Sequence, residues 1–222
     1  MALNKLKFNS LNVTPTAGKT VGFNSDADGL EATLSGGSMT FIKKLTASSS
    51  GDLSFLNGSS DVVFDSTYKE YLFIFNNIHP GTNSVYFQFQ VDTGTNTNYN
   101  QTITSTNFQA YHTESDSGTG LSYGSSDDQA QGTAFQRMQQ FINNDNDNSV
   151  SGYLHFFNPG SSTFVKHFFG RLHTQQTSGG QTYQNEMYPA GYVNTTTAIT
   201  RIQFKMSSGN IDAGTITLYG IN

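Results

Sequence analysis

Apolar and polar residues alternate along much of the chain, most clearly in the stretch VYFQFQV at residues 85–91. Every second residue from Val85 to Val91 is apolar, while Tyr or Gln occupies the positions between. A period of two places the apolar side chains on one face of a half-buried β-strand. Similar runs rich in Phe, Tyr, Val and Ile predict further strands at 41–47, 62–64 with 68–78, 103–112, 152–172 (as a hairpin), 187–194, 198–206 and 215–221.

One segment, residues 133–142, is ambiguous by its pattern. Phe135, Met138 and Ile142 have helical spacing, and Thr133 with Gln136 could form a capping box at a helix start. Turn residues flank the segment on both sides and strands surround it in the sequence, so we favour a strand over a helix.

The connections between these runs have the composition of turns. HPGTNS (79–84), NPGSS (158–162) and SSGNIDAG (207–214) each join two predicted strands, and we expect hairpins there. We interpret residues 175–186 as a polar loop. Pro189 cannot donate a hydrogen bond to a neighbouring strand, which places its own short strand at a sheet edge.

About ten strands without intervening helices predict an all-β fold. We expect a β-sandwich, jelly-roll-like, because this is the common arrangement at that strand count. The sandwich domain should span residues 39–222. Residues 1–38 have turn residues throughout and too few apolar residues for a core, and we predict an extended N-terminal arm or a loosely attached β-element. Its isolated apolar residues should serve as an assembly arm that docks onto another subunit: Leu3, Leu6, Phe8, Leu11 and Val13.

The composition excludes several classes of protein. Only 12% of the 222 residues are charged, Ser, Thr and Asn make up about a third, and the net charge is −5. The 18 Phe and 11 Tyr argue against disorder, and the absence of Cys excludes disulfides. The 11 Lys and Arg are scattered, so we expect no nucleic-acid partner. No window approaches the length of a membrane span, and we expect no membrane partner.

Asn24, Asp26 and Asp28, followed by Gly29, match the first half of a calcium-binding loop. The second half fails because Ser35 stands where a bidentate Glu is needed. We therefore expect a polar turn and no bound metal, with these three residues as weak candidates only.

The histidines of the predicted hairpin at 152–172 are candidate metal ligands. A four-residue loop at NPGSS would place His155 opposite Lys166 or His167. A zinc site also needs a third ligand such as a carboxylate, and this hairpin contains none. We expect structural histidines.

No arrangement of residues indicates catalysis, and we expect a protein that is not an enzyme. The chain has only four Glu, in no paired setting, and no G-x-S-x-G nucleophile motif. Five tyrosines with polar neighbours could stack on sugars, contribute to an interface, or simply form cross-strand pairs: Tyr111, Tyr123, Tyr183, Tyr188 and Tyr192.

Three blocks carry a family resemblance: residues 64–80 (FDSTYKEYLFIFNNIHP), 152–168 (GYLHFFNPGSSTFVKHF) and 207–221 (SSGNIDAGTITLYGI). They resemble virion structural proteins of marine bacteriophages, including cyanophages. The resemblance implies a capsid-associated, fibre or tail-associated protein located in the virion, with no catalytic residues and no cofactor. It also implies other virion proteins as partners and a homo-oligomer, with a trimer favoured. The alternative is a receptor- or glycan-binding module of a phage tail appendage, which would bind a host surface glycan.

Overall fold

The structure is a computed structural model that describes residues 20–23, 30–33, 38–65 and 67–222. The chain divides into two compact units, Met1–Thr40 and Phe41–Asn222. In the first unit, β1 (Thr20–Phe23) pairs antiparallel with β2 (Leu30–Thr33). Five residues that we predicted to form an assembly arm, Leu3, Leu6, Phe8, Leu11 and Val13, lie outside the described residues.

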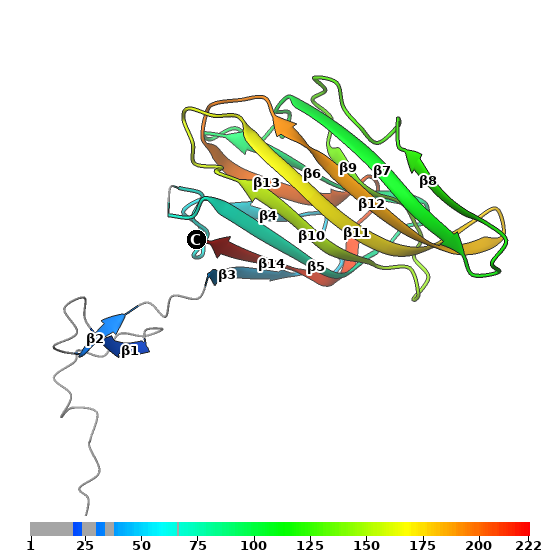
Figure 1. Cartoon of the computed structure of the whole chain (residues 1–222), viewed down its shortest axis with the longest axis horizontal. Coiled ribbons are helices and arrows are strands. Elements are labelled where there is room, and N and C mark those ends of the chain that lie inside the picture. Colours follow the sequence, from blue (N-terminus) through cyan, green and yellow to red (C-terminus); the bar gives the residue numbers. More distant parts are fainter. Residues whose placement is uncertain (1–19, 24–29, 34–37, 66) are drawn as a thin grey trace, which may run out of the picture. The chain divides into compact units, whose positions relative to one another are not determined.

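The second unit is all-β, as the sequence predicted, and its described residues form no helix, so none that could cross a membrane. Figure 1 shows the strands in two layers. The strands are β3 (Met39–Thr46), β4 (Leu53–Leu56), β5 (Glu70–Pro80), β6 (Val85–Thr93), β7 (Ile103–Thr113), β8 (Thr119–Tyr123), β9 (Gln136–Ile142), β10 (Val150–Phe157), β11 (Lys166–Ser178), β12 (Gln181–Val193), β13 (Ile199–Met206) and β14 (Ile211–Ile221). The ambiguous segment 133–142 contains β9, so the preference for a strand is confirmed.

Two sheets pack face to face as a β-sandwich. The larger has eight strands in the order β3-β14-β5-β10-β11-β12-β7-β8, and the smaller has four in the order β4-β13-β6-β9. Every pairing whose register is described is antiparallel. The larger sheet therefore has twice as many strands as the smaller one.

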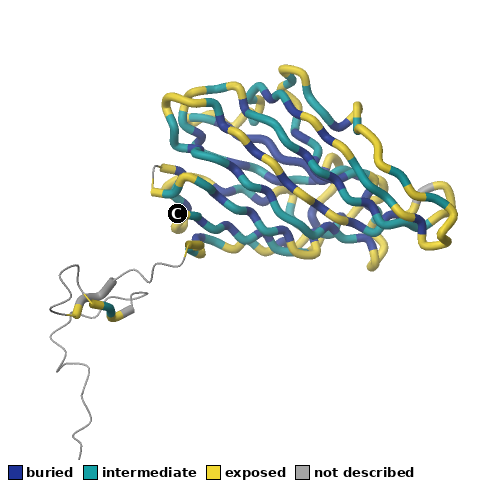
Figure 2. The backbone as a smooth tube through the Cα atoms, in the orientation of Figure 1, coloured by how far each residue is buried: buried dark blue, intermediate teal, exposed yellow. Residues whose placement is uncertain are grey.

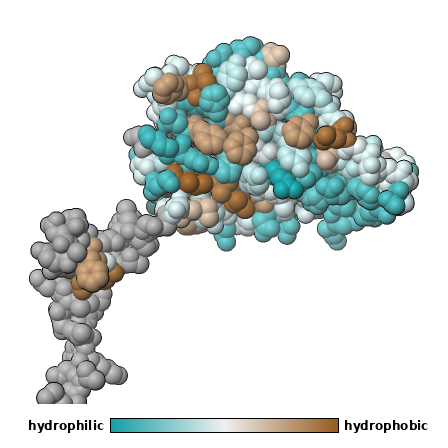
Figure 3. Space-filling model, viewed as in Figure 1, coloured by the Kyte–Doolittle hydropathy of each residue, from teal (hydrophilic) through white to brown (hydrophobic). Residues whose placement is uncertain are grey.

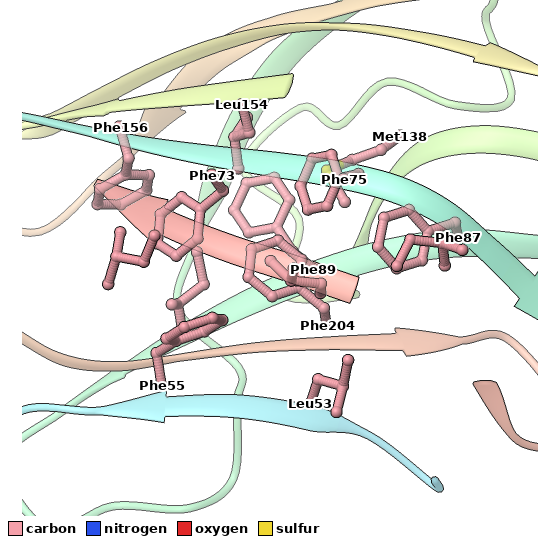
Figure 4. Close-up of a cluster of buried hydrophobic side chains, with 14 of the residues drawn as sticks. Leu53, Phe55, Phe73, Phe75, Phe87, Phe89, Met138, Leu154, Phe156 and Phe204 are labelled. Carbon is pink, nitrogen blue, oxygen red and sulfur yellow. The ribbon is translucent and has the colours of Figure 1, made fainter. Parts of the chain in front are cut away.

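The core lies between the sheets and consists mainly of aromatic residues. Alternation along β5 gives the burial pattern that a half-buried strand requires, with Tyr71, Phe73 and Phe75 buried and the residues between them partly exposed. Figure 2 shows a similar alternation along β13, whereas β6 is buried at nearly every position, including Gln88, Gln90 and Asp92. Figure 4 shows side chains from both sheets meeting in this layer, with Phe204 of β13 among them.

Two of the three predicted hairpins are wrong. HPGTNS joins β5 to β6 and SSGNIDAG joins β13 to β14, yet in both cases the two strands belong to different sheets. Turn residues indicate only that the chain changes direction. Whether the next strand pairs with the last or faces it across the core depends on the other strands. The hairpin at NPGSS is confirmed, since β10 pairs with β11.

The region 175–189 also differs from the prediction. Residues 175–186 form no loop, because β11 continues to Ser178 and β12 begins at Gln181. Gly179 and Gly180 close this hairpin with φ values of 60° and 76°, which glycine adopts without a steric penalty. Pro189 lies inside the sheet, opposite Asn107 of β7, and not at an edge. The β11–β12 pairing is interrupted beside it, between the Phe169–Ala190 and Leu172–Met187 pairs, where proline cannot donate.

Candidate functional site

The outer face of the eight-stranded sheet, defined as the face turned away from the four-stranded sheet, carries most of the exposed aromatic groups. The strand period of two sends every second side chain to this face. Five of the large apolar residues that the described part of the chain exposes lie on it: Phe41, Phe108, Leu121, Tyr123 and Phe169. Figure 3 views the molecule from this side and shows hydrophobic residues dispersed among polar ones.

His155 stands at the centre of one aromatic group on the outer face. Its ring is stacked on Phe169, with centroids 4.8 Å apart and planes 18° apart, and on Phe157 at 6.2 Å. Tyr153 contacts the same ring edge-on at 5.3 Å. Nδ1 of His155 is hydrogen-bonded to Oε1 of Glu70 on the adjacent strand β5. The imidazole is therefore held in place by aromatic contacts and one carboxylate.

The expected pairing of His155 with Lys166 or His167 is wrong. The β10–β11 register places Phe169 opposite His155, because the connection runs from Asn158 to Val165 and is longer than the assumed four residues. His167 instead contacts Tyr192 of β12, with ring centroids 6.0 Å apart. The carboxylate that the hairpin lacks comes from Glu70, which is 85 residues away in the sequence.

A second group on the outer face combines an aromatic stack with an ion pair. Phe108 of β7 and Tyr188 of β12 are cross-strand partners with parallel rings 4.6 Å apart. Arg171 lies on β11, the other neighbour of β12, and its guanidinium is 5.8 Å from the Tyr188 ring centre. Its Nε donates to Oε1 of Glu186 at 2.5 Å, and the Tyr188 hydroxyl donates to Oε2 at 2.6 Å. Both oxygens of the Glu186 carboxylate are thus occupied.

The surroundings of Glu186 keep its carboxylate charged. Burial alone would raise the pKa, but the hydrogen bonds from Arg171 and Tyr188 outweigh it and lower the pKa of Glu186. The same hydrogen bond raises the pKa of the Tyr188 hydroxyl. The ion pair therefore persists at neutral pH, and this part of the face presents little net charge to a partner.

A shallow hollow of about 450 Å³ lies on the outer face beside the group that surrounds His155. Phe157, Phe169, His167 and Tyr192 form its aromatic walls, and Thr104 and Thr106 of β7 contribute hydroxyl groups. No acidic residue lines it. An aromatic surface with a few polar groups and paired charges has the composition of the centre of a protein interface.

The five tyrosines that the sequence singled out separate onto two sides of the eight-stranded sheet. Tyr123, Tyr188 and Tyr192 lie on the outer face. Tyr111 and Tyr183 point to the inner side, where they line a separate cleft. Within β12, Tyr183 has an odd residue number, whereas Tyr188 and Tyr192 have even numbers. The alternation of a strand therefore places Tyr183 on the opposite face from Tyr188 and Tyr192. Because we predicted a loop at residues 175–186, the sequence analysis could not assign Tyr183 to a face. Odd and even positions distinguish two faces only within a strand.

The weak metal candidates Asn24, Asp26 and Asp28 lie outside the described residues. Within residues 20–23, 30–33, 38–65 and 67–222, no group of three or more His, Asp or Glu side chains is close enough to hold a metal ion. The Glu70–His155 and Arg171–Glu186 pairs were both missed at the sequence level. Finding them needs the register between strands that are distant in sequence.

We compared the chain with known proteins by sequence and by structure. No protein-family model, no curated protein and no solved structure matches it. Function must therefore be inferred from the strand order, from the side chains described above and from the resemblance of the three sequence blocks.

Proposed function

We propose that this protein is a non-enzymatic structural component of a bacteriophage virion that acts through protein–protein assembly. The three sequence blocks that resemble marine phage virion proteins support the location. They now fall on β5, on the β10–β11 hairpin and on β14, which are adjacent in the eight-stranded sheet. The blocks thus share one structural region.

The strand order carries the proposal. Removing the hairpins β7–β8 and β11–β12 leaves two four-stranded sheets, β3-β14-β5-β10 and β4-β13-β6-β9. In that arrangement the first strand pairs with the last, and successive strands alternate between the sheets except at β6 and β9, which are neighbours in the smaller sheet, as in the double Greek key of a jelly roll. Jelly rolls are frequent in viral capsid proteins and in lectins. We propose a jelly roll in which two inserted hairpins widen one sheet.

The outer face is the proposed assembly surface, and its proposed occupant is a second copy of this chain. Within this face Arg171 is paired with Glu186, and Glu70 is hydrogen-bonded to His155. Tyr, Phe and Arg are enriched at interfaces and Lys is depleted. An aromatic surface with these internal pairs suits a closed homo-oligomer, and the phage resemblance favours a trimer.

Native mass spectrometry of the purified protein tests the assembly surface. Phe169→Ser should shift the population toward monomer, because the substitution removes an apolar ring from the centre of the outer face. Phe141→Ser is the matched control, since both rings are 42% exposed and Phe141 lies on β9, in the other sheet. A wild-type protein that is monomeric at all concentrations contradicts the assembly surface.

Virion location is tested separately on purified phage particles. Antibodies raised against the sandwich should label particles at symmetric positions, and proteomics of washed particles should detect the chain at constant stoichiometry. Absence of the chain from washed particles contradicts the virion proposal. A glycan-degrading activity of the purified protein would contradict its non-enzymatic character.

A further inference from the structure

A cleft of about 610 Å³ lies on the inner side of the eight-stranded sheet, beside β9, the edge strand of the smaller sheet. The inserted hairpins supply most of its lining, with β7 and β12 on one side and the edge strand β9 of the four-stranded sheet on the other. Side chains of β7, β9 and β12 line it together with the tips of the β7–β8 and β11–β12 turns. Small-molecule sites commonly enclose roughly 300–1,000 Å³.

Two tyrosines, together with Phe141, provide aromatic surface in the cleft. Tyr111 of β7 and Tyr183 of β12 lie edge to face, with ring centroids 6.0 Å apart and planes at 64°. The position of the Tyr111 ring depends on Gly120 of β8, where a Cβ atom would lie 2.6 Å from Cε1 of the ring. Among the described residues, neither tyrosine hydroxyl has a protein hydrogen-bond partner. Both hydroxyls are available to a ligand.

Three side-chain amides line the same cleft in a fixed arrangement. Oε1 of Gln109 accepts from Nε2 of Gln140 at 2.6 Å and from Nδ2 of Asn185 at 2.7 Å. This network orients the amide planes before any ligand arrives. Asn185 is 1% exposed, and its Oδ1 has no hydrogen-bond partner within the described part of the chain. A buried acceptor without a partner is energetically unfavourable.

The cleft contains no charged side chain. Its remaining lining residues are Thr113, Ser117, Gly118, Phe141, Gly179 and Gln181. An anionic or cationic ligand would be desolvated there without a counter-charge, which is costly. A ligand that fits must therefore be neutral, rich in hydroxyl groups that both donate and accept, and equipped with an apolar surface for the tyrosine rings.

We infer that this cleft binds a neutral glycan. Sugar hydroxyls match amide and phenol groups, which offer both donors and acceptors, and the C–H face of a pyranose ring packs against an aromatic ring. Sulfated and uronic-acid glycans are excluded by the missing cations. The site lies on the opposite side of the sheet from the proposed assembly surface. Failure of one proposal therefore does not imply failure of the other.

Binding is tested with the full-length protein and neutral oligosaccharides of glucose, galactose and mannose, using glycan arrays followed by calorimetry. At least one neutral oligosaccharide should bind, and Tyr183→Ala should weaken its affinity about tenfold through loss of stacking. Tyr183→Phe keeps the ring and should retain most of the affinity. Gln140→Ala should also weaken binding, since it removes one of the two donors that orient Gln109.

Phe164→Ala is the control variant and should bind as the wild type does, because this 67% exposed ring lies on the β10–β11 connection and outside the cleft. Melting temperatures of all variants verify that each one is folded. The inference is overturned if no neutral glycan binds, if only sulfated or uronic-acid glycans bind, or if Tyr183→Ala and Gln140→Ala leave the affinity unchanged.

Discussion

Phe73 of β5 and Phe204 of β13 face each other across the sandwich with ring centroids 5.2 Å apart. Each ring comes from a different sheet, so this contact joins the two layers directly. Phe204 also lies within aromatic contact of four further rings: Phe55, Phe75, Phe87 and Phe89. It is fully buried. Phe204 is therefore a central contact between the sheets.

Phe204→Ala should destabilise the sandwich by about 3–5 kcal/mol, because it removes a buried ring and leaves a cavity among five others. Urea denaturation followed by far-UV circular dichroism measures the change. Phe164→Ala, at a ring that is 67% exposed, is the control and should change stability little. Equal effects of both substitutions would contradict the assigned role of Phe204.

Gly152→Ala should destabilise β10 strongly. A Cβ atom at this position would lie 2.2 Å from the backbone oxygen of Arg171, and φ is 153°, a value that L residues rarely adopt. The neighbouring β11 backbone would have to move to relieve the contact. Gly51→Ala is the matched control, since nothing lies within 4 Å of its added Cβ. Thermal unfolding should show a large loss for the first variant and almost none for the second, and similar melting temperatures would refute this prediction.

Lys166 should make stability depend on alkaline pH. Its side chain is fully buried, and Nζ donates to the carbonyl oxygens of Ser161, Phe164 and Thr195 at 2.7, 2.9 and 3.2 Å. Burial lowers the pKa of Lys166 below its usual 10.5. As the pH falls below 10.5, the unfolded chain takes up this proton before the folded protein does, so the contribution of Lys166 to stability decreases.

The free energy of unfolding of the wild type, relative to Lys166→Met, should therefore increase as the pH rises toward 10.5. The thioether side chain of the variant cannot titrate, so the difference between the two proteins isolates the lysine. Urea titrations at a series of pH values give this difference. A value that stays constant or falls with rising pH would contradict a lowered pKa.

Deleting residues 1–38 should leave a folded sandwich. The buried hydrophobic cluster of the described residues begins at Ile42, so the truncated chain keeps all of it. We expect an unchanged melting temperature and a loss of binding to phage particles, because the deleted segment contains the predicted arm. Unfolding of the truncated protein would show that the domain boundary is wrong. A folded protein that still attaches would refute the arm.

A chelator should leave the melting temperature of the full-length protein unchanged within error. The loop with Asn24, Asp26 and Asp28 lacks the position-12 carboxylate of a calcium site, because Ser35 occupies that position. Differential scanning calorimetry with and without EDTA measures the effect. A decrease of several degrees that added calcium reverses would show that the protein binds a structural calcium ion, contrary to this prediction.

Local sequence pattern is sufficient for the fold class and for most strand positions. Alternation of apolar and polar residues is a local property, because neighbouring side chains on a strand point to opposite faces whatever the strand pairs with. The run from Val85 to Val91 therefore predicted β6 correctly, and the segment at 133–142 contains β9. Local pattern was weaker at the ends of elements, where polar residues 175–178 continue β11.

Strand neighbours and side-chain contacts depend instead on the complete fold. β5 and β6 follow one another in the chain but belong to opposite sheets, because each has one apolar face and the two faces are buried against each other. The pairing of His155 with Glu70 and the separation of Tyr183 from Tyr188 onto opposite sides of the sheet follow from strand order and register. These depend on how all strands together bury their apolar faces, and no local segment contains that information.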